Sequence, residues 1–289
     1  MRRIAFVGGL AAAALPLRGG ATPSLDAVAS EAAASSSGVV GAAVRALGDC
    51  RPALAYHADV VFPAASTIKS LILATLYAEA DADPSLLTRK VPIRDADRVG
   101  GSDVLATAPP GAQFTGAQLA HAMIVQSDNT AGNALITLLG FEAINQKATE
   151  LGLTHTQCKR HFMDFPAIWR HSDNLTTPRD MAMLFYEIEK GARGNGSDVA
   201  SQKACRAMVG ILLQQEDREK IAAGLPPGTP LANKTGEIAG VRSDVGIVDP
   251  YGATPYVLAV LTKNLADAHA GVLAIRKIAR AVNAAVAVC

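Results

Sequence analysis

The chain has 289 residues, of which 49% are hydrophobic, and a formal net charge of +1 at pH 7. This length and apolar content are sufficient for one or two buried cores. Because the charges nearly balance and no basic run stands out, composition gives no support for nucleic acid or an anionic membrane as a partner.

The first residues have the pattern of an export signal. Arg2 and Arg3 precede an apolar stretch over residues 4–16, and small residues follow at 19–21. The stretch is too short to span a bilayer as a stable helix, and no cysteine precedes Cys50, so we expect no stable membrane anchor. We interpret residues 1–21 as a signal peptide of an exported, periplasmic or secreted protein. An ordinary N-terminal helix is the alternative.

Strand and helix patterns follow in chain order. Strand-like runs over 38–47 and 53–59 flank a turn-rich segment that is typical of a hairpin connection. Apolar residues then recur at helical spacing over 66–80. Thr115 is a capping residue for the next expected helix.

The second half begins with helices and ends with strands. Thr177 followed by Pro178 is a helix cap with proline at the first helical position, and it opens a helix over 179–190. The remaining patterns predict a helix over 198–215, strands over 230–237, 242–249 and 256–263, and a last helix over 267–288. Pattern alone therefore predicts mixed α and β structure with the helices in the middle.

Three short motifs carry the equipment for nucleophilic catalysis: Ser66-Thr67-Ile68-Lys69, Ser127-Asp128-Asn129 and Lys234-Thr235-Gly236. A free serine is a weak nucleophile and needs an adjacent base. Lys69, one helical turn after Ser66, can take that role if burial and nearby cations lower its pKa. Taken singly, the motifs also fit a helix cap, a solvated lysine and a polar turn.

The order of these motifs and the intervals between them resemble those of class A β-lactamases and penicillin-binding proteins. The flanking Phe62-Pro63-Ala64 and Thr176-Thr177-Pro178 fit the same family, and the resemblance covers nearly the whole chain after residue 21. It implies a three-layer α+β sandwich domain with an antiparallel sheet, made from residues 24–62 and 216–289. An all-helical domain over 63–215 would be inserted in it, with the active site at the interface. The family precedent also implies a monomer.

The resemblance assigns the reacting groups to particular residues. It implies that Ser66 is the nucleophile, that Lys69 takes its proton, and that Ser127 relays a proton to the leaving nitrogen. Asn129 would hydrogen-bond the amide side chain of the substrate. The backbone N–H groups of Ser66 and Glu237 would form the oxyanion hole.

A second group of residues is implied to bind the substrate's carboxylate. Lys234 and Thr235 would offer a cation and a hydroxyl, and Gly236 would permit close approach of the backbone. Arg242 could reinforce this binding from the next strand, or it could form a surface salt bridge with Asp244.

One loop departs from the family. Class A enzymes carry an Arg-x-Glu-x-x-x-Asn pattern before the Thr-Thr-Pro helix, and its glutamate serves deacylation. Here no glutamate occurs between Glu150 and Glu187. Asp164, one methylene shorter, is the best substitute base, or else it braces the loop through Arg160 or Arg170. Weaker candidates are Asp173 and Asn174. We therefore expect acylation more firmly than fast deacylation.

No cofactor or metal is expected, since the six histidines show no close metal-ligand pairing. Four cysteines allow three complete disulfide pairings. If the fold follows the family, Cys50 and Cys289 come together, which leaves Cys158 and Cys205 as possible partners. Four reduced thiols are the alternative.

The leading hypothesis is thus a secreted serine β-lactamase that forms an acyl-enzyme on Ser66. A D-alanyl-D-alanine carboxypeptidase or an esterase with the same serine machinery is a second. A penicillin-binding module that acylates without fast turnover is a third. Each takes a small β-lactam or a D-Ala-D-Ala-like molecule as substrate.

Overall fold

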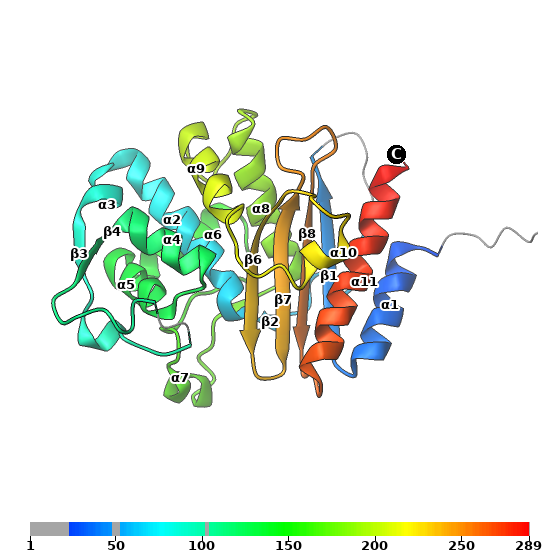
Figure 1. Ribbon diagram of the computed structural model, residues 1–289, viewed down its shortest axis with the longest axis horizontal. Coiled ribbons are helices and arrows are strands. Elements are labelled where there is room, and N and C mark those ends of the chain that lie inside the picture. The colour runs from blue at the N-terminus through cyan, green and yellow to red at the C-terminus, as the bar shows by residue number, and fades with distance from the viewer. Residues whose placement is uncertain (1–22, 48–52, 102–103, 289) are drawn as a thin grey trace, which may run out of the picture.

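The computed structural model describes residues 23–47, 53–101 and 104–288. Its main sheet has four antiparallel strands, and the first strand of the chain pairs with the last. Because of this pairing, both ends of the chain build one layer (Figure 1). In spatial order the strands are β1 (Val39–Ala46), β8 (Tyr256–Lys263), β7 (Val241–Val248) and β6 (Leu231–Ile238).

Helices from the two ends of the chain cover one face of this sheet. α1 (Leu25–Ser36) and α11 (Ala268–Ala287) lie side by side there, with the short α10 (Ile221–Gly224) against α11 (Figure 1). α11 turns an apolar stripe inward, and Ile275, Ile278 and Val282 pack on the sheet at helical spacing. This burial forms the smaller of the two cores.

The middle of the chain is helical and forms the larger core. α2 (Lys69–Ala82) is buried around most of its circumference, since Leu71, Ile72, Leu73 and Leu76 are fully buried. Around it lie α3 (Ser85–Thr88), α4 (Gly116–Val125), α5 (Asn129–Leu139), α6 (Phe141–Glu150), α7 (Phe165–Trp169), α8 (Pro178–Ala192) and α9 (Gln202–Leu212). Short 3-10 turns η1 (Ala65–Ile68) and η2 (Asp95–Asp97) and two small strand pairs, β2 (Phe62–Pro63) with β5 (Leu175–Thr176) and β3 (Lys90–Pro92) with β4 (Gln113–Thr115), complete the described elements.

The expected mixed α and β class with an antiparallel sheet is confirmed, and so are the predicted caps. Thr115 and Thr177 each accept a hydrogen bond from the backbone three residues later, as N-caps do. The predicted helix over 198–215 is shorter, since α9 begins after Ser201 and ends at Leu212. α1 was not predicted from the pattern.

The predicted strand over 53–59 is wrong. Backbone hydrogen bonds join Ala42 to Tyr56 and Val44 to Leu54, so this segment does follow β1. It turns before a regular ladder forms, and His57 takes the left-handed conformation with a φ of 46°. A single left-handed residue ends strand geometry locally.

Several predictions concern residues outside the described ranges. The signal segment over 1–21, the hairpin turn at 48–52 and the Cys50–Cys289 disulfide all involve such residues. A disulfide between Cys158 and Cys205 is not formed, because both are buried free thiols.

Within the described residues, no helix combines the length and apolarity needed to cross a membrane. The division into 24–62 with 216–289 and 63–215 stays a prediction, and α8 of the middle segment packs on the main sheet.

Candidate active site

A cavity of about 770 Å³ lies where η1, the turn before α5, the loop around α7 and the end of β6 meet. Residues from all three sequence motifs line it, namely Ser66, Ser127, Asn129 and Thr235, and so does Glu237, which follows the third motif. These residues come from distant parts of the chain, and only the fold brings them together.

The backbone around the nucleophile candidate is held in uncommon conformations. Ala65, which precedes Ser66, has a φ of 46°, and Ser127 has a φ of 58°. Such non-glycine residues persist only where the surrounding structure holds them. Gly236 is part of that support, because a Cβ there would lie 3.1 Å from Thr67 and 3.2 Å from the Ala64 carbonyl. The absence of a side chain at Gly236 thus lets β6 approach η1.

Lys69 is fully buried, and its amine is surrounded by acceptors. Its Nζ donates to the Ser127 carbonyl at 2.6 Å and to Asn129 Oδ1 at 2.8 Å, and it lies 3.3 Å from Ser127 Oγ. Burial lowers the pKa of Lys69 well below its usual value, and the nearby Lys234 lowers it further. Both effects favour the neutral amine, which can accept a proton.

Lys234 lies on the other side of the same hydroxyl. It is fully buried, and its Nζ donates to Ser127 Oγ at 3.0 Å and to the Thr235 carbonyl at 2.9 Å. Burial lowers the pKa of Lys234 to about 7, against the opposing effect of Asp244. The Ser127 hydroxyl therefore bridges two amines whose burial has pushed both toward neutrality.

The other two residues of the middle motif hold the loops in place. Asp128 caps α5 by accepting from the Ala131 N–H at 2.7 Å, and it also accepts from the Leu105 N–H at 2.9 Å. Asp128 therefore braces the loop. Asn129 uses its oxygen on Lys69 and donates its Nδ2 to the Gly100 carbonyl at 3.0 Å.

The loop before α8 presents apolar side chains to the cavity. Its Phe162 is buried, and the ring centroid lies 4.4 Å from Lys69 Nζ, which makes a cation–π contact whenever Lys69 is protonated. Met163, Phe165 and Ile168 continue this wall. The ring fits because the facing Gly132 has no Cβ, which would lie 2.6 Å from it.

Sequence reasoning missed Phe162, although a signal was available. Arg160 forms a buried ion pair with Asp173, with 2.7 Å between Nη2 and Oδ1. If Arg160 is taken as the arginine of the family's Arg-x-Glu pattern, then Phe162 stands at the position of the glutamate.

Asp164 is engaged as a helix cap. Its Oδ1 accepts from the Ala167 N–H at 3.0 Å, at the start of α7, and Asp164 is not among the residues that line the cavity. The alternative prediction, a brace between Asp164 and Arg160, is not seen, because Arg160 pairs with Asp173. Asn174 binds the backbone N–H groups of residues 159 and 160.

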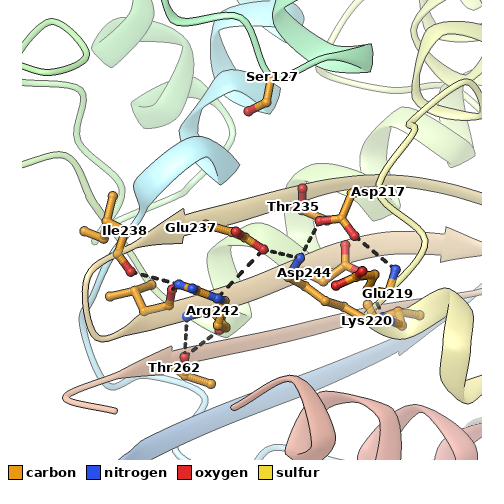
Figure 2. A network of polar contacts seen from close by, with 12 residues as sticks. Ser127, Asp217, Glu219, Lys220, Thr235, Glu237, Ile238, Arg242, Asp244 and Thr262 are labelled. Atoms are coloured by element: carbon orange, nitrogen blue, oxygen red, sulfur yellow. Dashed lines mark hydrogen bonds and ion pairs between the residues drawn. The ribbon is translucent and has the colours of Figure 1, made fainter. Parts of the chain in front are cut away.

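A chain of alternating charges joins residues 217–220 to the end of β6 and the start of β7 (Figure 2). Lys220 Nζ contacts the carboxylates of Asp217 and Glu237, the latter at 2.5 Å, and Arg242 Nε lies 3.9 Å from Glu237. Neither Lys220 nor Asp217 was predicted. The alternative pairing of Arg242 with Asp244 is wrong, because Asp244 accepts from Asn233 and from the Ile221 N–H.

The described residues contain no cluster of three or more His, Cys, Asp or Glu side chains placed to hold a metal ion. The groups in this cavity are suited to nucleophilic attack and proton transfer by side chains. A hydroxyl, a buried amine and a bridging hydroxyl next to a second amine are the parts that such chemistry uses.

Comparison with known proteins agrees with this arrangement. The sequence model of the β-lactamase enzyme family matches residues 24–286. A β-lactamase of Kitasatospora aureofaciens is 30% identical over 72% of this chain and 67% of its own length. The β-lactamase AST-1 of Nocardia asteroides is 31% identical over 75% of this chain and 69% of its own.

Solved structures of a β-lactamase and of PBP-A match nearly the whole chain. A β-lactamase of Sphaerobacter thermophilus is 34% identical, with a TM-score of 0.81 over 91% of this chain and 97% of its own. The protein PBP-A is 29% identical, with a TM-score of 0.80 over 91% and 96%. A variant of PBP-A with a leucine changed to glutamate, described as an acyl-enzyme complex with penicillin G, is 30% identical with a TM-score of 0.80 over 91% and 97%. This chain belongs to the β-lactamase enzyme family.

Proposed function

We propose that this protein is a serine β-lactamase that opens the β-lactam ring through an acyl-enzyme on Ser66. The observation that carries the proposal is the Ser127 hydroxyl, which contacts both Lys69 and Lys234 and lines the same cavity as Ser66. Family membership supports the same conclusion.

In the proposed acylation, neutral Lys69 takes the proton of the Ser66 hydroxyl while its oxygen attacks the lactam carbonyl. The oxyanion that forms is stabilised by the backbone N–H groups of Ser66 and Glu237. When the carbon–nitrogen bond breaks, Ser127 donates its proton to the departing nitrogen. Protonated Lys69 then returns a proton to Ser127, so the charge balance of the site is restored.

Recognition of the substrate is proposed to use three further groups. Lys234 and Thr235 are the candidates for contact with a carboxylate, and the Asn129 amide for contact with the acyl side chain. Arg242 is a weaker candidate, since its guanidinium donates to the Ile238 and Val241 carbonyls, whereas Lys234 contacts Ser127 in the cavity wall.

Hydrolysis of the acyl-enzyme is proposed to be the slow step. Efficient general base catalysis needs a base within hydrogen-bond reach of the attacking water. Phe162 lies against Lys69, and the nearest loop carboxylate, Asp164, is used as a helix cap. This observation favours a second candidate function, a penicillin-binding enzyme whose acyl-enzyme persists.

The mass of the intact protein after brief exposure to benzylpenicillin tests the proposal. A covalent adduct that decays while a chromogenic cephalosporin is turned over repeatedly supports the β-lactamase. An adduct that persists after a single stoichiometric burst supports the second candidate. Ser66→Ala is expected to form no adduct, and the absence of any adduct on the unaltered protein would overturn both. Export of the protein through residues 1–21 remains a proposal, tested by sequencing the mature N-terminus.

A further inference from the structure

Three groups near Glu237, namely Thr235, Lys220 and Arg242, are already engaged with carboxylates of the protein itself, whereas Lys234 is bound to Ser127 and to the Thr235 carbonyl. The Thr235 hydroxyl hydrogen-bonds to Asp217. Lys220 contacts both Asp217 and Glu237, and Arg242 lies near Glu237 (Figure 2). Asp217, Thr235 and Glu237 all line the cavity.

Lys220 needs these anions because its side chain is fully buried. A buried charge without a partner is strongly destabilising. Burial acts to lower the pKa of Lys220, but hydrogen bonds from its ammonium to Asp217 and Glu237 outweigh burial and raise that pKa. Lys220 therefore stays charged, and its charge is satisfied inside the protein.

Asp217 and Glu237 are held very differently. Asp217 accepts hydrogen bonds from Lys220 and from the Glu219 N–H as well as from Thr235, which fixes its carboxylate. Glu237 is 48% exposed at its side chain and is held by ion pairs with Lys220 and Arg242 alone among the described residues. Glu237 is thus the carboxylate that can move when a ligand enters.

The wall of the cavity is acidic around this point. Its charged lining residues include the carboxylates Glu216, Asp217 and Glu237, and its Arg160 is paired with Asp173. An entering anion would meet like charges here, which is unfavourable. An entering ligand with an uncharged or cationic group would not meet this repulsion.

We propose that Glu237 determines substrate specificity as an internal carboxylate that competes with the carboxylate of a substrate. Glu237 thereby reduces the advantage of a substrate that carries a carboxylate at this position over one that carries an uncharged group there. This inference rests on the proposed function, because it concerns the same cavity and the same acylation of Ser66.

The test compares benzylpenicillin with its methyl ester, which lacks the negative charge. Glu237→Gln keeps the size of the side chain and its backbone N–H, and Lys220 remains paired with Asp217. The quantity measured is the second-order acylation rate constant for benzylpenicillin divided by that for the ester. We expect this variant to raise the ratio by about fivefold or more, because removing the repulsion of one half-exposed charge changes a free energy by about 1 kcal/mol. Intact-mass kinetics measure both rate constants.

Glu216→Gln is the matched control. Glu216 also lines the cavity, but its side chain forms no ion pair with the described residues. We expect its ratio of acylation rate constants, acid over ester, to stay within about twofold of that of the unaltered protein, because an exposed charge has little effect. An unchanged ratio in Glu237→Gln, or an equal rise in both variants, would overturn the role of Glu237.

Failure of the proposed function would be seen separately, as the absence of any Ser66 adduct. The dissociation constants of acid and ester in the Ser66→Ala background do not depend on acylation. In that background, Glu237→Gln is expected to tighten binding of the acid relative to the ester. If it does not, Glu237 does not compete with the ligand.

Discussion

Phe162→Glu tests the link between the loop before α8 and the fate of the acyl-enzyme. The ring of Phe162 lies 4.4 Å from Lys69 Nζ, measured to its centroid. Glutamate has its carboxyl carbon at about the distance from Cα of that centroid, so its carboxylate can take the place of the ring. The variant thus introduces a candidate base beside Lys69.

The expected magnitudes follow from this separation. Two opposite unit charges about 4.4 Å apart, at an effective permittivity of about 20, attract by about 4 kcal/mol, and this attraction raises the pKa of Lys69. Water that enters the space left by the ring makes this an upper bound. A positioned general base contributes about 10²–10⁴-fold to a rate. Acylation should therefore need a higher pH, while deacylation becomes faster.

Intact-mass kinetics can follow both steps, as formation and loss of the benzylpenicillin adduct between pH 5 and 9. Phe162→Gln is the control, because it removes the ring and adds a side chain of glutamate's size without its charge. Both variants lose a buried aromatic, which costs on the order of 3 kcal/mol of unfolding free energy, so thermal melting is measured alongside. The reasoning is refuted if Phe162→Gln accelerates deacylation as much as Phe162→Glu does. It is also refuted if the acid limb of acylation does not move in Phe162→Glu.

Two further predictions concern Asp164 and Lys234. Asp164→Ala removes the cap of α7, which should lower the unfolding free energy by about 1 kcal/mol and leave deacylation nearly unchanged, whereas Asp164→Asn should preserve both. Denaturant unfolding and adduct lifetime measure these effects, and a long-lived adduct specific to Asp164→Asn would instead identify a base. Because burial lowers the pKa of Lys234 to about 7, its ammonium is lost as the pH rises through that value. The second-order acylation rate for benzylpenicillin should then fall above about pH 7 relative to its methyl ester, and parallel pH profiles for acid and ester would contradict a carboxylate contact.

Local sequence signals were sufficient for much of the fold. Thr115 and Thr177 marked the starts of α4 and α8 because an N-cap depends only on the next three residues. The strands β6, β7 and β8 were recognisable from their apolar runs for a similar reason. The predicted strand over 53–59 failed because its pairing depends on β1 and on the left-handed His57.

The sequence by itself determined which reactive groups the chain carries, because each motif is contiguous and its chemistry follows from residue type. It also determined that the loop lacks a glutamate. The tertiary structure alone decided what surrounds those groups. It placed the Phe162 ring against Lys69 and joined Glu237 to Lys220. The pKa of an amine depends on its burial, and the ion-pair partner of a carboxylate depends on contacts between distant segments. Neither property can be read from the order of a few neighbouring residues.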